Sequence, residues 1–179
     1  MSQLRIEELP SYTYEDYVRW EGRWELIHGI PYAMSPAPSI QHQIISHKID
    51  VALAKSLKGC EHCQALLPVD WKINNSTTVQ PDNLVVCEKP EGQYLTKAPS
   101  IIFEILSKST AKKDQNTKFR LYEEEGVKYY IIVDPKDQVA KVYQLQNGKF
   151  VKVLGATDEN CNFDLGKCQV KFDFSTIWG

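Results

Sequence analysis

Apolar residues follow different periods along the chain, and these periods separate predicted helices from predicted strands. From Ser39 to about Gly59 they recur at helical spacing, which predicts an amphipathic helix. Segments 82–88 and 100–107 are apolar almost throughout, as strands are when both faces of a sheet are covered. Residues 139–153 alternate about Asn147-Gly148, a pair that tolerates the positive φ values of a tight turn, so we predict a β-hairpin there.

Weaker patterns predict the remaining elements. In chain order these are a short helix capped by Thr13 and stopped by Gly22, a hairpin about His28-Gly29, a strand over 63–73 interrupted at Pro68, a helix from Ser109 or Asp114 to Glu125, a buried strand over 127–134, and a strand with a turn of helix over 168–179. The order predicts an α/β fold of the mixed α+β kind, with one central mixed β-sheet flanked by helices and an additional hairpin near the C-terminus. No repeat or linker divides the sequence, so we expect residues 1–179 to form one domain.

Composition narrows the classes of protein that remain open. The 179 residues are 42% hydrophobic and 25% charged, which is typical of a soluble globular protein, and no apolar stretch is long enough to span a membrane. The segment MSQLRIEELP has acids where a secretion signal needs a basic start, so we expect a cytoplasmic location. A net charge of -2 gives no overall attraction to nucleic acid, so contact with nucleic acid requires a local basic patch.

The chain has five cysteines, an odd number that suits a reducing compartment better than a disulfide framework. Cys60 and Cys63 form a C-x-x-C pattern, which begins some zinc sites and some redox pairs. Zinc needs four ligands, and Cys87, Cys161 and Cys168 do not form a second such pair, so we expect free thiols. A thiol or zinc protein that uses Cys60 and Cys63 is the alternative of another class.

Two carboxylates interrupt the apolar strands. Glu104 shares one strand face with Ile102 and Leu106, and Asp82 opens the other apolar run. An isolated buried carboxylate is costly, so each acid must be exposed, neutralised, paired with a cation or bound to a metal. One hard divalent ion shared by both acids would meet this need on adjacent strands, since Mg²⁺ prefers oxygen ligands. For either acid alone, a surface position or a pair with lysine is the alternative.

These residues follow an order that resembles a known family. Pro81-Asp82, Glu104 in an apolar strand, a lysine-containing helix and then GVKYYIIVDP are similar to the PD-(D/E)xK phosphodiesterase (restriction-endonuclease-like) superfamily, and more closely to its putative restriction endonuclease family. The resemblance implies a restriction-endonuclease-like core. It also implies a metal-dependent DNA endonuclease that hydrolyses phosphodiester bonds with water activated by Mg²⁺, for which Mn²⁺ would substitute.

The resemblance assigns roles to particular residues. Asp82 and Glu104 match the metal ligands, and a lysine helps to stabilise or orient the attacking group. The superfamily motif places that lysine two residues after the second acid, where this chain has Leu106. In the resembling family the role moves to the following helix, where Lys118 is the matching position. Asp114 precedes Lys118 by four residues, so an ordinary exposed helix ion pair is the alternative.

Accessory residues follow from the same resemblance and from the sequence. The family carries an acid and a histidine at the positions of Glu25 and His42. Glu25 would complete the metal shell, and His42, on the apolar side of its helix, would otherwise be a core histidine bonded to backbone. Lys108 would lie on the same strand face as Glu104 but four residues further along the chain, so we expect it to contact phosphate.

A local basic cluster surrounds the second helix and would hold a nucleic-acid backbone. Its members are Lys108, Lys112, Lys113, Lys118, Arg120 and Lys128. The alternative is a solvated helix face balanced by residues 123–125.

The expected partners are DNA and, by analogy with nucleases that cut both strands, a second copy of the chain as a homodimer. The main rival is a catalytically inactive module of the same fold that binds nucleic acid or a protein partner. The absence of the strand lysine favours that rival.

Overall fold

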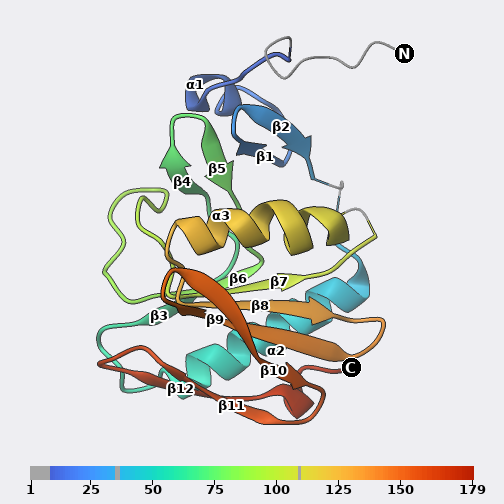
Figure 1. Ribbon diagram of the computed structural model, residues 1–179, viewed down its shortest axis with the longest axis vertical. Helices are drawn as coiled ribbons and strands as arrows, with labels where there is room; N and C mark the ends of the chain where they lie inside the picture. The colour runs from blue at the N-terminus through green and yellow to red at the C-terminus, as the bar shows by residue number, and fades with distance from the viewer. Residues whose placement is uncertain (1–8, 35–36, 109) are drawn as a thin grey trace.

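A six-stranded mixed sheet forms the middle of the computed structural model, which describes residues 9–34, 37–108 and 110–179 (Figure 1). Its strand order is β10-β9-β8-β7-β6-β3. The strands are β3 (Gln64–Leu66), β6 (Asn83–Val86), β7 (Ile101–Ile105), β8 (Tyr129–Asp134), β9 (Val139–Gln146) and β10 (Lys149–Ala156). β7 and β8 pair in parallel and the other pairs are antiparallel, which confirms the predicted mixed sheet.

Helices cover both faces of this sheet. Helix α2 (Ile40–Ser56) begins at Ser39, whose side chain accepts a hydrogen bond from the His42 N–H, and it packs on the face that carries Phe103 and Ile105. Helix α3 (Lys118–Glu124) packs on the opposite face, which carries Ile102. The predicted division of β7 side chains between two faces is therefore confirmed. None of the helices in the described ranges has both the length and the apolar character needed to cross a membrane.

A second sheet, of order β2-β1-β5-β4, lies on the far side of α3, so α3 is enclosed between two sheets (Figure 1). Its strands are β1 (Trp24–Ile27), β2 (Ile30–Ala33), β4 (Trp71–Asn74) and β5 (Thr77–Val79), and the short helix α1 (Tyr14–Tyr17) begins at the predicted Thr13 cap. The single predicted sheet is therefore wrong. Proline has no N–H to donate to a strand ladder, and at Pro68 the predicted strand over 63–73 divides between the two sheets.

The C-terminal region contains one strand more than the sequence predicted. β11 (Asn160–Asp164) and β12 (Gln169–Asp173) form a two-stranded sheet, and a turn of 3₁₀ helix (Phe174–Thr176) follows. Phe163 and Phe172 from this sheet join the core that α2 forms with the main sheet. The tail therefore packs beside α2 on the same face of the main sheet, with the rings of Phe163 and Phe172 against that of Phe103 on β7.

The predicted hairpin turn at Asn147-Gly148 is confirmed, with φ values of 51° and 75°. Gly148→Ala is expected to lower the free energy of unfolding by about 1 kcal/mol, because an L-residue is strained at this φ while the space around the new Cβ is open. Gly155→Ala, in β10 and without a positive φ, is the matched control and should be neutral or stabilising in the same urea titration. Equal losses in both variants would contradict this account.

The predicted free thiols are wrong at four of the five cysteines. The structure joins Cys60 to Cys168 and Cys63 to Cys87 as disulfides and leaves Cys161 free. No pattern in the sequence brings these four together, since the bridged pairs are separated by 108 and 24 residues.

Candidate active site

The two predicted acids lie side by side on neighbouring strands. Asn83 of β6 pairs with Phe103 of β7, so Asp82, one residue earlier, stands opposite Glu104. The Asp82 Oδ2 atom accepts a hydrogen bond of 2.8 Å from the N–H of Ile105, which fixes its carboxylate at the end of β7. Asp82 and Glu104 line one cavity of about 140 Å³. The two carboxylates therefore converge as the sequence predicted.

Lys118 reaches the same cavity from the helix. Its Nζ atom lies 2.7 Å from Oε1 of Glu104 and 2.7 Å from Oε1 of Glu25. The Tyr122 hydroxyl, one turn further along α3, donates to the same Glu104 oxygen at 2.7 Å. The Lys118 side chain is 2% exposed, so it does not form the exposed helix pair that Asp114 offered as an alternative; the Asp114 side chain lies outside the described residues.

A π-helical turn, η2 (Lys113–Thr117), precedes α3 and sets the direction of two lysines. The N–H of Lys118 donates to the carbonyl of Lys113, five residues earlier. On an α-helix, side chains five residues apart point about 140° away from each other around the axis. In the wider π turn they lie on the same side of the helix. Both ammonium groups consequently reach Glu25, and Lys113 Nζ lies 2.6 Å from its Oε2.

Glu25, on β1, is fully buried and holds these lysines from the second sheet. Its Oε1 also accepts a hydrogen bond of 2.8 Å from the N–H of Gln80. Burial raises the pKa of Glu25, but the charges of Lys118 and Lys113 and their hydrogen bonds outweigh burial, so its pKa lies below the ordinary value. Glu25 is therefore an anion whose two oxygens are both bonded to protein donors.

His42 approaches the site from the first turn of α2. Its Nε2 atom lies 3.2 Å from Oδ2 of Asp82, so its ring bonds to a carboxylate and not to backbone. Burial raises the pKa of Asp82, and the His42 contact, the Ile105 N–H and Lys118 together hold it below the ordinary value. The Nδ1 atom of His42 is buried and has no hydrogen-bond partner among the described residues.

Contacts that the sequence did not indicate complete the site. Ser46, one turn after His42, donates to Oδ1 of Asn83 at 3.0 Å and accepts from its amide through the carbonyl at 3.0 Å, which fixes α2 against β6. Arg23 also lines the cavity, just before β1. No motif distinguished these residues, because their roles depend on the approach of the second sheet and of α2 to the main sheet.

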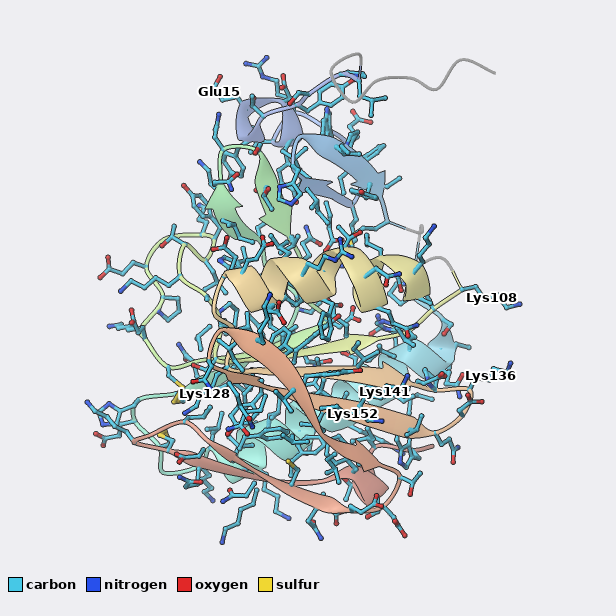
Figure 2. All side chains as sticks on the ribbon, in the orientation of Figure 1. Glu15, Lys108, Lys128, Lys136, Lys141 and Lys152 are labelled. Carbon is cyan, nitrogen blue, oxygen red and sulfur yellow. A yellow bond between two sulfur atoms is a disulfide. The ribbon has the colours of Figure 1, made fainter. Side chains whose placement is uncertain are left out.

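Of the remaining predicted basic residues, Lys113 lines the cavity and Lys108, Lys112 and Arg120 do not. Lys108, Lys112 and Arg120 are exposed, while Lys113 is turned inward to Glu25. Lys108 lines a shallow hollow of about 560 Å³ that also includes His42 and Lys136, and Figure 2 shows Lys108 and Lys136 projecting at the same edge of the molecule.

The donor set suits a hard divalent cation. Three carboxylates, those of Glu25, Asp82 and Glu104, face the two ammonium groups of Lys113 and Lys118, which leaves one negative charge in this group of five. No hydrogen bond from the described residues reaches Oδ1 of Asp82. A carboxylate pair that lines a small cavity is the kind of oxygen site that Mg²⁺ binds.

A mixed sheet between helices, with an aspartate and a glutamate paired across two of its central strands and a lysine above them, defines a restriction-endonuclease-like fold of the nuclease class. The chain belongs to the putative restriction endonuclease family, Uma2, whose model matches residues 14–160. Membership of this family and the fold together support a nuclease-like function.

Two relatives illustrate the likeness. The chain is 32% identical over 122 residues to the uncharacterized protein slr1290 of Synechocystis, and the match covers 63% of this chain and 63% of that protein. A crystal structure of a putative nuclease belonging to DUF820 from Anabaena variabilis superposes with a TM-score of 0.74 at 16% identity, covering 93% of this chain and 97% of the other. At that identity the superposition establishes the shared fold.

Proposed function

We propose that this protein is a metal-dependent phosphodiesterase, an endonuclease that hydrolyses phosphodiester bonds of DNA. The observation that carries the proposal is the convergence of Asp82, Glu104 and Lys118 on one cavity, from β6, β7 and α3. Family membership supports it independently. We also propose the cytoplasmic location and the homodimer that the sequence led us to expect.

In this proposal Asp82 and Glu104 hold the metal, with Mg²⁺ as the natural ion and Mn²⁺ as a substitute. When bound, the ion would lower the pKa of a water ligand and offset charge that develops on phosphate. Lys118 would then orient the attacking group, since Glu25 and Glu104 leave its ammonium little freedom. His42 would keep the Asp82 carboxylate in its ligating orientation.

Substrate would be held by groups around the cavity. Arg23 lies on the cavity wall, and Lys108 and Lys136 lie at the edge of the adjoining hollow. Such cations bind phosphate without reading sequence, so affinity for DNA should fall as salt rises. We propose that Glu25 and Lys113 position Lys118 and that Glu25 is not a metal ligand, because both oxygens of Glu25 already accept bonds from the protein.

Incubation of the full chain with supercoiled plasmid tests the proposal. We expect nicked or linear plasmid with Mg²⁺ or Mn²⁺, and intact plasmid with a chelator. Cleavage that persists in chelator, or intact plasmid with every divalent metal and DNA form tested while the protein remains folded by circular dichroism, would contradict an active metal nuclease.

The rival function is a nuclease-fold module that binds without cutting. Two observations favour it, namely Leu106 in place of the strand lysine and the engagement of Lys118 with two carboxylates at once. A gel-shift experiment with the same DNA separates the two, since the rival requires salt-sensitive binding with no product at any metal concentration.

A further inference from the structure

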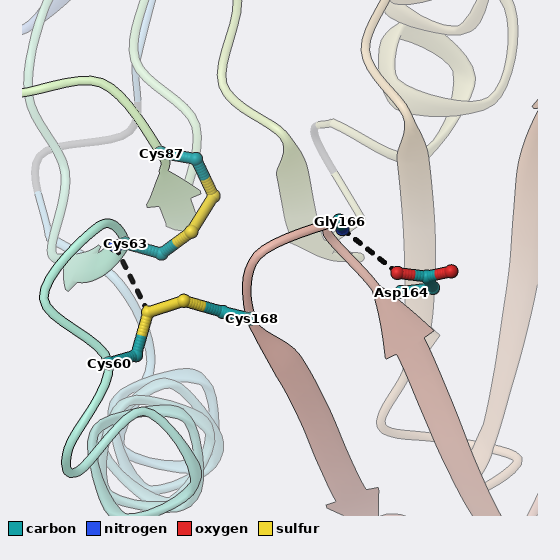
Figure 3. Close-up of a disulfide and its surroundings, with 6 residues drawn as sticks. All are labelled: Cys60, Cys63, Cys87, Asp164, Gly166 and Cys168. Atoms are coloured by element: carbon teal, nitrogen blue, oxygen red, sulfur yellow. Dashed lines mark hydrogen bonds between the residues drawn. A yellow bond between two sulfur atoms is a disulfide. The ribbon is translucent and has the colours of Figure 1, made fainter.

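Four cysteines from distant parts of the chain meet beside the end of α2 (Figure 3). Cys60 and Cys63 lie between α2 and β3, Cys87 follows β6, and Cys168 precedes β12. The Cα atoms of Cys60 and Cys168 are 6.0 Å apart and those of Cys63 and Cys87 are 3.9 Å apart. The C-x-x-C pair thus gains two further sulfur atoms that the sequence did not associate with it.

The sulfur atoms form one group and not two separate bridges. The Sγ atoms of Cys60, Cys63 and Cys168 all lie within 4.8 Å of one another, and the Sγ of Cys87 is bonded to that of Cys63. In a tetrahedral zinc site, Zn–S bonds of about 2.3 Å place the sulfurs about 3.8 Å apart. Once the disulfides are reduced, rotation of the Cys87 side chain would have to bring its sulfur toward those of Cys60 and Cys168 to reach that spacing.

The backbone around the cluster resembles a metal-binding turn. The N–H of Cys63 donates to the Sγ of Cys60 at 3.3 Å, a contact that stabilises a thiolate at Cys60. Cys168 is fixed by a turn in which its carbonyl accepts the Leu165 N–H at 2.9 Å, and in which the Gly166 N–H donates to Asp164 at 2.8 Å (Figure 3). Cys63 and Cys168 are each 6% exposed, so their thiolates would need a cation.

We propose that in the reduced protein Cys60, Cys63, Cys87 and Cys168 bind one Zn²⁺ ion as a structural four-thiolate site. Reduction of the two disulfides takes four electrons and four protons from two molecules of a dithiol, each of which becomes a disulfide. Binding of Zn²⁺ then releases the four thiol protons. The ion ties the β11–β12 sheet to the end of α2 and to strands β3 and β6 of the main sheet, so the site is independent of the proposed nuclease function.

Thiol counting on the full chain tests the proposal without any substitution. The chain is reduced with a dithiol, freed of it, and treated with a disulfide reagent under native conditions after addition of excess chelator or of one equivalent of Zn²⁺. We expect five reactive thiols in chelator and one, Cys161, with zinc. Zinc should also raise the melting temperature of the reduced protein. Five reactive thiols in both samples would overturn the proposal.

Cobalt substitution identifies the ligands. Co²⁺ bound by thiolates gives sulfur-to-metal charge-transfer absorption, which the oxygen donors of Asp82 and Glu104 cannot give. Cys87→Ser and Cys168→Ser should each lose about a quarter of that absorption, one thiolate in four. Cys161→Ser is the matched control and should retain all of it. Loss in the control equal to that in the two variants, or no charge-transfer absorption in the unsubstituted chain, would reject the site.

Discussion

Glu104→Gln is expected to reduce metal-dependent DNA cleavage by about 100-fold or more while leaving the protein folded. Glutamine has nearly the shape of glutamate, and its carbonyl oxygen can still accept the bonds that Lys118 and Tyr122 donate to Oε1. What the variant lacks is the negative charge that a divalent ion requires. Asp82→Asn should behave in the same way, because Asn can still accept the Ile105 N–H.

Initial rates of plasmid nicking over a range of Mg²⁺ concentrations measure this loss, with melting temperatures as the check on folding. Glu91→Gln is the matched control, since Glu91 is an exposed acid on the loop between β6 and β7. Lys118→Met should lose cleavage as well, but with an unchanged Mg²⁺ requirement in its residual activity. If Glu104→Gln cuts as fast as the parent chain, the carboxylate pair does not hold the metal.

Glu25→Gln is expected to destabilise the fold by about 3 kcal/mol, because it leaves the ammonium groups of Lys113 and Lys118 buried beside a neutral amide. The pKa of Glu25 is lower in the folded chain than its ordinary value of about 4.3. Its charge therefore stabilises the protein above that ordinary pKa, and the stabilisation is lost as pH falls through the folded-state pKa. The difference between parent and variant should be largest near neutral pH and shrink in acid.

Urea unfolding at neutral pH and at several values below about pH 4 measures this dependence. Lys149→Ala provides the comparison, since Lys149 forms an exposed pair with Glu123 and should change stability by less than about 1 kcal/mol. A loss for Glu25→Gln as small as that of the control would mean that the two lysines do not depend on Glu25.

The sequence predicted those parts of the site that depend on local pattern. Strand parity placed Glu104 on the opposite face from Phe103 and Ile105, and the helix that follows the strand carries Lys118 to that face. The second apolar run supplied Asp82 as the partner of Glu104, and the resemblance to a family matched both to metal ligands. Both inferences required only the alternation of side chains along a strand and the order of the predicted elements, and both can be read from the sequence.

The features that the sequence did not predict depend on contacts between distant segments. The division of the predicted strand at Pro68 between two sheets could not be foreseen, because each half finds its hydrogen-bond partners elsewhere in the chain. The meeting of Cys87 and Cys168 with the C-x-x-C pair likewise depends on how β6 and the β11–β12 sheet pack. The π turn at 113–117 carries no composition that separates it from an α-helix.

The π turn at 113–117 has a consequence for how this helix can change during evolution of the family. A π turn differs from a regular α-helix by one inserted residue, so loss of one residue within 114–117 would restore an α-helix in which Lys113 and Lys118 are four residues apart and lie on the same face. The core would keep its packing, and both lysines would still face Glu25. One-residue insertions and deletions at 114–117 are therefore a way in which this helix can change in length while the lysine pair is retained.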